Sequence, residues 1–122
     1  MKKILLVEDD PLMVKIYTTR FKKAGLELES VSDGENAISR LKGENFDLLI
    51  LDLVLPRLTG FEILEKIRGD EKLKDLKVVI LSNLDQKTDV KKANELKVAR
   101  YLIKAHYKPS EVVEEILKVL EE

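Results

Sequence analysis

The chain has 122 residues, 44% of them hydrophobic and 37% charged, and this length and composition predict a single globular domain over residues 1–122. Lysine and arginine (22) nearly balance aspartate and glutamate (23), so we expect neither direct nucleic acid contact nor membrane insertion. With no cysteine and one histidine, disulfides, thiol chemistry and polyhistidine metal sites are excluded, and the N-terminal apolar run is too short for a signal peptide, so a cytoplasmic location is expected.

Five short apolar runs predict the strands of a sheet. Residues 4–7, 48–51 and 78–81 are continuously apolar, which is typical of central parallel strands covered on both faces. Residues 26–31 alternate apolar with polar side chains, and residues 101–103 are few, so these two runs are predicted as edge strands.

Amphipathic segments separate these strands. The first helix is predicted to begin at Pro11 with Asp10 as its N-cap and to end at Gly25. The second is predicted to begin at a capping box formed by Ser32 and Glu35. Three further helices are predicted near residues 61–67, 87–96 and 112–120, of which the fourth helix has a thin apolar face and the fifth a strong one.

Strict alternation of strands and helices predicts an α/β fold, in which a parallel sheet is covered by helices on both faces. Ligands bind to such sheets beyond the carboxyl ends of the strands. The second strand ends without a functional residue type. If it is the outer edge, in the order 2-1-3-4-5, the other four strand ends are consecutive and their polar residues converge on one crevice.

Those four strand ends all carry candidate site residues. Each has an ordinary explanation, since an acidic residue can cap a helix, as is favoured for Asp10, a serine can belong to a turn, and a lysine can be a solvated charge. Burying a carboxylate is costly unless it is paired or metal-bound, which favours a functional role for Asp52. The candidates are Glu8, Asp9 and Asp10 after the first strand, Asp52 after the third, Ser82 and Asn83 after the fourth, and Lys104 after the fifth.

These residue types predict phosphoryl chemistry. Three carboxylates without histidine or cysteine form a hard oxygen site that suits Mg²⁺. Lys104 and Ser82 are candidates to hold the remaining phosphoryl oxygens, because phosphoryl transfer is catalysed mainly by positioning and charge neutralisation. Asp52 is then the nucleophile, and it would form an aspartyl phosphate.

With these motifs, the whole chain resembles the receiver domain of bacterial two-component response regulators, of the chemotaxis-response-regulator type. The resemblance implies a flavodoxin-like (βα)5 three-layer sandwich with a five-stranded parallel sheet of order 2-1-3-4-5. The matching stretches read KILLVEDD at residues 3–10, LDLVLP at 51–56 followed by GFE at 60–62, LSN at 81–83 and YLIK at 101–104.

The resemblance implies a phosphorelay switch rather than an enzyme, although the switch catalyses its own phosphorylation and dephosphorylation. It implies that Asp52 accepts phosphate from a histidine kinase or a histidine phosphotransfer protein and that Asp52 belongs to the metal site. Asp9 is implied to bind Mg²⁺ directly, with help from Glu8, often through water, and from the Val54 backbone carbonyl.

The resemblance also implies a switch and an output surface. Ser82 and Lys104 are implied to contact the phosphoryl group, and Tyr101 to report the switch through its rotamer. The fourth helix, fifth strand and fifth helix are implied to bind a downstream effector or a second copy of the chain. Each charge of this surface could simply be solvated, but their pattern predicts weak, phosphorylation-enhanced self-association or effector docking that salt weakens. The basic residues are Lys87, Lys91, Lys92, Lys97 and Arg100, and the acidic residues are Glu111, Glu114 and Glu115.

Four positions depart from the family pattern. Ala105 stands where proline usually follows the lysine, and a trans Lys104–Ala105 peptide is predicted because cis costs about 2.5–4 kcal/mol before a non-proline residue. Lys97 occupies a usual glycine position, so the end of the fourth helix is expected to be rebuilt. The Asn83 amide is expected to reach the phosphoryl pocket or to crowd it. His106 is expected to have a loop or packing role.

Other functions account for the sequence less well. A haloacid-dehalogenase-like phosphatase needs a second aspartate two residues after the nucleophile, where Val54 stands. A flavin mononucleotide carrier or a P-loop nucleotidase needs glycine-rich phosphate loops that the sequence lacks. An interaction module without phosphorylation is disfavoured by the intact candidate site. Whether the chain is a stand-alone receiver or the receiver fragment of a longer DNA-binding regulator stays open.

Overall fold

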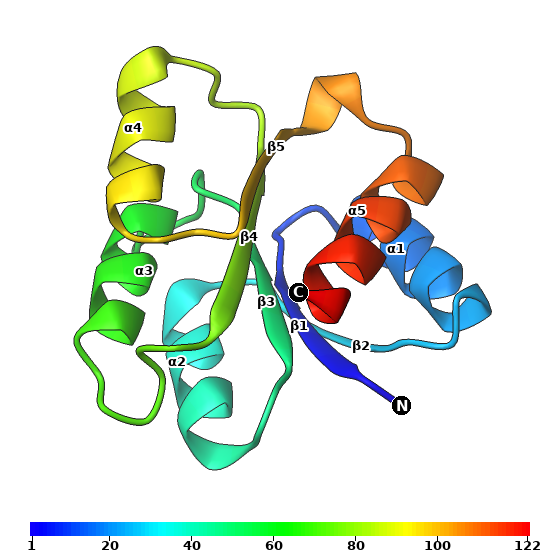
Figure 1. Ribbon diagram of the computed structural model, residues 1–122, viewed down its shortest axis with the longest axis horizontal. Helices are drawn as coiled ribbons and strands as arrows, with labels where there is room; N and C mark the ends of the chain where they lie inside the picture. The colour runs from blue at the N-terminus through cyan, green and yellow to red at the C-terminus, as the bar shows by residue number, and fades with distance from the viewer.

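The computed structural model describes residues 1–122 and contains a five-stranded parallel sheet between two layers of helices (Figure 1). The strand order is β2-β1-β3-β4-β5, which confirms the predicted fold. The strands are β1 (Lys3–Val7), β2 (Glu27–Val31), β3 (Leu48–Leu51), β4 (Lys77–Ser82) and β5 (Arg100–Ile103). The helices are α1 (Pro11–Lys23), α2 (Gly34–Gly43), α3 (Gly60–Arg68), α4 (Lys87–Glu95) and α5 (Pro109–Glu121), with a 3-10 turn η1 (Lys104–His106).

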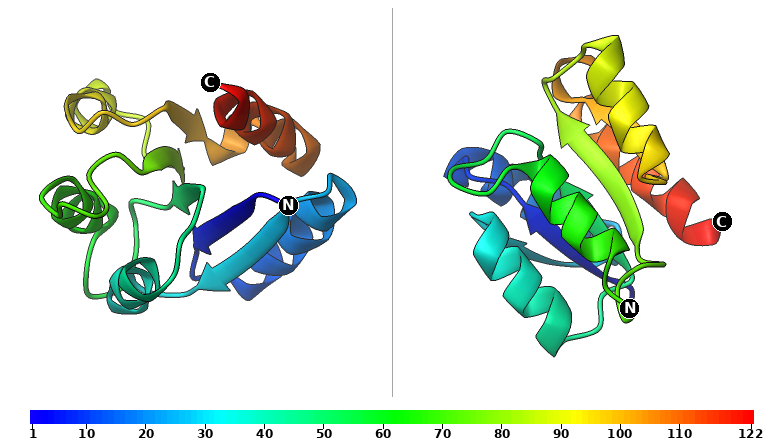
Figure 2. Two further views of the ribbon diagram at one scale, coloured as in Figure 1. Left: turned by 60° about the horizontal axis from the view of Figure 1, so that its bottom comes forward. Right: turned by 90° about the vertical axis from the view of Figure 1, so that its left-hand side faces the viewer.

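The two faces of the sheet have separate hydrophobic cores. Leu5 and Val7 of β1 pack in the core under α2, α3 and α4, whereas Ile4 and Leu6 pack in the core under α1 and α5. Figure 2 shows α2, α3 and α4 in a row in front of the sheet, with α5 behind it. Because both faces are covered, the central strands are apolar throughout. No helix of the chain combines the length and apolarity that crossing a bilayer requires.

Helix α1 begins as the sequence predicts. Asp10 accepts a hydrogen bond from the Leu12 amide at 3.0 Å, and Pro11 occupies the first helical position. The helix is followed by Gly25, whose positive φ of 80° lets the chain turn into β2. The capping role predicted for Asp10 is therefore confirmed.

The predicted start of α2 is wrong by one residue. The N-cap is Asp33, not Ser32, because the Asp33 carboxylate accepts the Asn36 amide at 2.9 Å and the Asn36 side-chain amide at the same distance. A carboxylate with two acceptor oxygens satisfies both donors, which a single hydroxyl does less well. The nearby Arg57 guanidinium adds an ion pair to Asp33 at 3.4 Å.

Helix α4 is held weakly to the core, but its end is tied firmly. Ala93 is its one buried residue, in agreement with the thin apolar face predicted. Lys97 keeps a left-handed φ of 60°, so the prediction that this helix end is rebuilt is wrong. The reason is Arg68 of α3, whose guanidinium donates to the carbonyls of Leu96 at 2.8 Å and Lys97 at 3.1 Å and so fixes the turn.

The conformation of Lys97 generates a stability prediction. Replacing Lys97 with glycine should raise the free energy of unfolding by about 0.5 to 1 kcal/mol, because glycine adopts a positive φ without the steric cost that a side chain incurs. The matched control is Lys91→Gly, at an exposed position in the middle of α4, which should lower the free energy of unfolding by about 1 kcal/mol. Urea denaturation measures both changes. A loss of stability in Lys97→Gly similar to that of the control would contradict the prediction.

Candidate functional site

Three carboxylates meet at the carboxyl edge of the sheet. Glu8 and Asp9 follow β1 and Asp52 follows β3, and these strands are neighbours. Carboxylate oxygens of the three residues all lie within 4.8 Å of one another. Glu8 and Asp52 are buried, with 2% and 6% of their surfaces exposed, whereas Asp9 is exposed. Three of the four acidic candidates therefore come together, whereas Asp10 caps α1.

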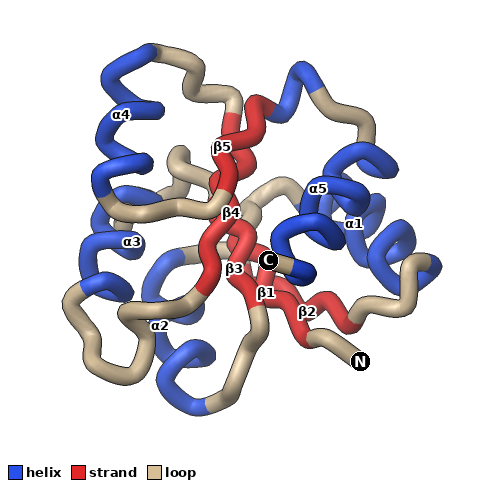
Figure 3. Tube along the Cα trace, viewed as in Figure 1, coloured by secondary structure: helices blue, strands red, loops and turns tan.

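Lys104 connects the two buried carboxylates. Its Nζ atom donates to Asp52 Oδ2 at 2.8 Å and to Glu8 Oε1 at 2.5 Å. Because β4 lies between β3 and β5 in the sheet, the side chain must extend past the end of β4 to reach them. The loops after β4 and β5 lie at the same end of the sheet, as the trace in Figure 3 shows.

The cluster shifts the ionisation of its members. Burial disfavours the charged form of Lys104, but the hydrogen bonds to Asp52 and Glu8 outweigh it and hold the pKa of Lys104 above its ordinary value. Burial raises the pKa of Glu8, which the hydrogen bond from Lys104 only partly opposes. The amine therefore stays protonated and supplies the positive charge that two buried carboxylates need.

Backbone groups fix the directions of the carboxylates. Glu8 accepts the Asp9 amide at 3.0 Å, and Asp52 Oδ1 accepts the Val54 amide at 3.1 Å. The chain after β3 also passes very close to the start of α3. A Cβ atom at Gly60 would lie 2.4 Å from the Asp52 carbonyl oxygen, so only glycine allows this approach.

Ser82 and Tyr101 share one backbone partner. Ser82 is fully buried at the end of β4, and its Oγ accepts the Leu84 amide at 3.3 Å. The Tyr101 hydroxyl donates to the Leu84 carbonyl at 2.7 Å. Sequence reasoning did not predict these two contacts of Leu84, because a main-chain partner leaves no signal in residue type. The β4–α4 loop is thus linked to both predicted switch residues.

Three of the four positions that depart from the family pattern, Asn83, Ala105 and His106, lie in the segments that follow β4 and β5. The Lys104–Ala105 peptide is trans, as predicted. Asn83 Oδ1 accepts a hydrogen bond from the Ala105 amide at 3.2 Å, so this oxygen binds the segment after β5. His106 is exposed in η1, in agreement with the expected loop role. Val54 is 58% exposed, which leaves its side chain in solvent beside Asp52.

The donor set fits a hard divalent cation. All three clustered side chains offer carboxylate oxygens, which Mg²⁺ and Mn²⁺ accept as ligands, and exposed Asp9 leaves one side open to solvent. The Lys104 ammonium occupies hydrogen-bonding positions on Glu8 and Asp52. The ammonium uses one oxygen of each of these carboxylates, Glu8 Oε1 and Asp52 Oδ2.

Comparison with known proteins gives consistent matches along the chain. A profile of the response regulator receiver domain family matches residues 4–117. The probable transcriptional regulator ycf27 of Porphyridium aerugineum is 32% identical over 98% of this chain and 48% of its own length. The alkaline phosphatase synthesis transcriptional regulatory protein PhoP of Bacillus subtilis is 31% identical over the same shares. The chain spans about half the length of these curated relatives.

Solved structures share the fold. The Vibrio cholerae chemotaxis protein CheY4 superposes with a TM-score of 0.89 at 24% identity and covers 98% of both chains. The Mn(2+)-bound form of response regulator Rcp1 superposes with a TM-score of 0.80 at 29% identity, over 99% of this chain and 90% of that chain. These similarities agree with the three-layer architecture and its strand order.

The environment of Tyr101 generates a titration prediction. Burial, together with the charges of Asp89 and Asp85, raises the pKa of Tyr101 to about 12. The folded pKa lies above the ordinary value of about 10, so the stabilisation from the neutral phenol is present below pH 10 and is lost as pH rises towards 12. Ultraviolet titration should show a phenolate step near pH 12 that Tyr101→Phe removes and Tyr107→Phe keeps. Ionisation of Tyr101 near its ordinary pKa in the folded protein would contradict this.

Proposed function

The chain belongs to the response regulator receiver domain family of two-component systems, and on that premise we propose that Asp52 is the phosphoacceptor of a signalling switch. One observation carries the proposal. The amine of Lys104 is bonded to the buried Asp52 carboxylate at 2.8 Å, at the point where two further carboxylates converge. A nucleophilic oxygen, a cationic donor and metal-ligand oxygens are thus all within reach of one phosphoryl group.

The metal site of the proposal consists of Glu8, Asp9, Asp52 and the Val54 backbone carbonyl. A cation held there, for which we propose Mg²⁺, would neutralise charge on the phosphoryl oxygens. Asp9 is the exposed ligand and is accessible from solvent, whereas Glu8 is buried and bonded to Lys104. The related response regulator Rcp1 has been solved in an Mn(2+)-bound form, which supports the binding of a divalent ion here.

The proposed reaction transfers a phosphoryl group from a phosphohistidine to Asp52. An Asp52 carboxylate oxygen attacks phosphorus in line with the leaving imidazole nitrogen, so that an O–P bond forms while the N–P bond breaks, and the imidazole takes a proton from solvent. The Lys104 amine moves from its Asp52 bond to a phosphoryl oxygen, and the Ser82 hydroxyl donates to another. Attack of water on phosphorus later releases inorganic phosphate and restores Asp52.

The proposed switch runs through Leu84. When the Ser82 hydroxyl turns to the phosphoryl group, its Oγ loses the hydrogen bond from the Leu84 amide. The β4–α4 loop, whose Leu84 carbonyl accepts a hydrogen bond from Tyr101, is then free to move. Helix α4 follows this loop and buries only Ala93, so its displacement disrupts little packing. The surface formed by α4, β5 and α5 would thereby change for a downstream effector.

The partners follow from this chemistry. The phosphodonor is a histidine kinase or a histidine phosphotransfer protein, because aspartate accepts phosphate from phosphohistidine in the family. The relatives named transcriptional regulators are about twice as long as this chain, which supports a receiver that forms part of a longer regulator. CheY4, of which this chain covers 98%, supports a stand-alone receiver. The gene's full reading frame distinguishes these two possibilities.

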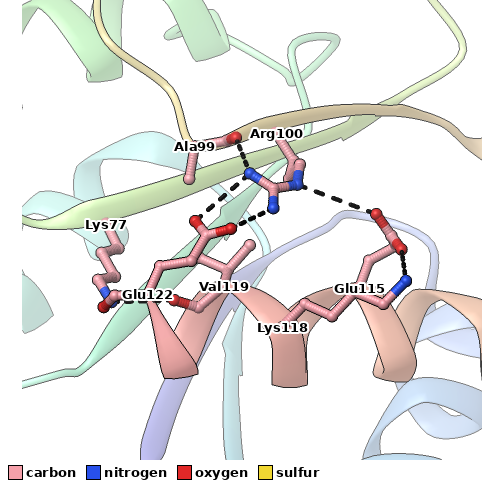
Figure 4. Close-up of polar contacts among 7 residues, drawn as sticks. All are labelled: Lys77, Ala99, Arg100, Glu115, Lys118, Val119 and Glu122. Atoms are coloured by element: carbon pink, nitrogen blue, oxygen red, sulfur yellow. Dashed lines mark hydrogen bonds and ion pairs between the residues drawn. The ribbon is translucent and has the colours of Figure 1, made fainter.

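The charges of the output surface are partly satisfied within the chain. Arg100 pairs with Glu122, lies 4.0 Å from Glu115 and donates to the Ala99 carbonyl, as Figure 4 shows. Lys92 pairs with Glu65 of α3 at 3.6 Å. These two cations are therefore less available to a second copy than the sequence pattern predicts. Of the charges in this set, Lys87, Lys91 and Lys97 and, on α5, Glu114 have no intrachain partner and remain for an intermolecular contact.

The phosphoacceptor is tested directly by mass. Incubation with Mg²⁺ and acetyl phosphate should add one phosphoryl group to the protein, because the carboxylate, the cation and Lys104 supply the positioning without a kinase. Intact-mass spectrometry should find no addition to Asp52→Asn. The matched control is Asp47→Asn at the opposite end of β3, which should be labelled like the wild type. Equal labelling of Asp52→Asn would overturn the assignment.

Self-association is tested by sedimentation. We expect a weak dimer that beryllofluoride, a phosphoryl mimic, strengthens and high salt weakens, because the remaining contacts are ionic and exposed. Lys91→Glu should reduce dimerisation, whereas Lys42→Glu on α2 should not. If the protein is a monomer with and without beryllofluoride, at low and at high salt, the dimer is excluded and effector docking is left as the output.

A further inference from the structure

A side-chain hydrogen bond joins the two loops that flank the Lys104 amine. Strands β4 and β5 are paired in parallel up to the partners Ser82 and Ile103. Beyond this last pair, Asn83 Oδ1 accepts the Ala105 amide at 3.2 Å. The asparagine side chain therefore adds one more connection between the strands, just past the point where their backbone pairing ends.

This connection lies next to the backbone of Lys104. The Lys104 carbonyl accepts a hydrogen bond from the Tyr107 amide at 3.3 Å, which closes the turn η1. The Ala105 amide, which belongs to the same peptide group as this carbonyl, donates to Asn83. The backbone on the C-terminal side of Lys104 is thus held by both bonds, while its amine is held by Asp52 and Glu8. The direction in which the Cα–Cβ bond of Lys104 leaves the chain limits which rotamers of its four rotatable bonds bring the amine to Asp52 and Glu8.

We propose that Asn83 is a positioning residue for Lys104, acting through the Ala105 amide. The two positions act as a pair, because the alanine provides an N–H group that a proline would lack and the asparagine provides its acceptor. Asn83 also directly follows Ser82, so a movement of Ser82 towards a phosphoryl group is passed to the backbone beside Lys104. This consequence for phosphotransfer rests on the proposed function, whereas the contact itself does not.

The contact is tested by hydrogen exchange in the full-length chain. In Asn83→Ala, the Ala105 amide should exchange roughly fivefold faster than in the wild type, which corresponds to the loss of one ordinary hydrogen bond. Asn83→Asp keeps the acceptor oxygen and should restore the protection. Gln86→Ala, whose side chain bonds only to Asp85 in the same loop, is the matched control and should leave the exchange unchanged. Unaltered exchange in Asn83→Ala overturns the proposal.

The positioning of the amine is tested by trace acetylation. The Lys104 amine should be labelled faster in Asn83→Ala than in the wild type, relative to exposed Lys2, because it spends less time bonded to Asp52 and Glu8. Circular dichroism and urea denaturation of the same variants check that the fold is kept. Labelling of Lys104 that is unchanged, while the Ala105 exchange increases, overturns the positioning role.

The effect on phosphotransfer is tested by a double-mutant cycle. Asn83→Ala should slow phosphorylation by acetyl phosphate roughly fivefold in the wild-type background. It should have no further effect in Ala105→Pro, because that variant has no N–H group for Asn83 to accept. Equal effects in both backgrounds overturn the coupling through Ala105. If the wild type itself is not phosphorylated, the proposed function fails, and exchange and acetylation still decide whether Asn83 positions Lys104.

Discussion

The ion pairs of Lys104 with Glu8 and Asp52 are the constraint on which the arrangement of the site depends. Two carboxylates buried at adjacent strand ends destabilise the fold unless a positive charge reaches them. That charge belongs to Lys104, which follows β5, two strands away from β3. Its side chain must therefore extend past the end of β4. The end of β4 carries the small, fully buried Ser82, which leaves room for the lysine side chain.

The same constraint links the site to its surroundings. A group that replaces Lys104 on Asp52 changes what the ends of β4 and β5 face, and β4 leads into a helix with few tertiary restraints. Helix α4 buries one residue, but Arg68 fixes its C-terminal end. Motion in this region is therefore expected at the N-terminal end of α4, where the loop through Leu84 connects Ser82 with Tyr101.

Much of the architecture is predictable because burial on two faces leaves a clear pattern. The continuous apolar runs of β1, β3 and β4 identify central strands, and the alternating run of β2 identifies an edge strand, whereas the full strand order rested in part on the family resemblance. The contacts of Arg68 and Leu84 could not be predicted, since main-chain carbonyls and amides are the same in every residue. The competition of Asp33 with Ser32 for the α2 cap was also missed, because both residue types cap helices well.

In the proposed metal site, Mg²⁺ and Lys104 would compete for the negative charge of Glu8 and Asp52. Calorimetric titration of Mg²⁺ into the wild type and into Lys104→Met tests it most directly, with Lys108→Met as a control in the same loop region. The variant should bind Mg²⁺ more tightly, because Glu8 and Asp52 lose their cationic partner, while the control binds like the wild type. Unchanged or weaker binding by Lys104→Met would contradict the account.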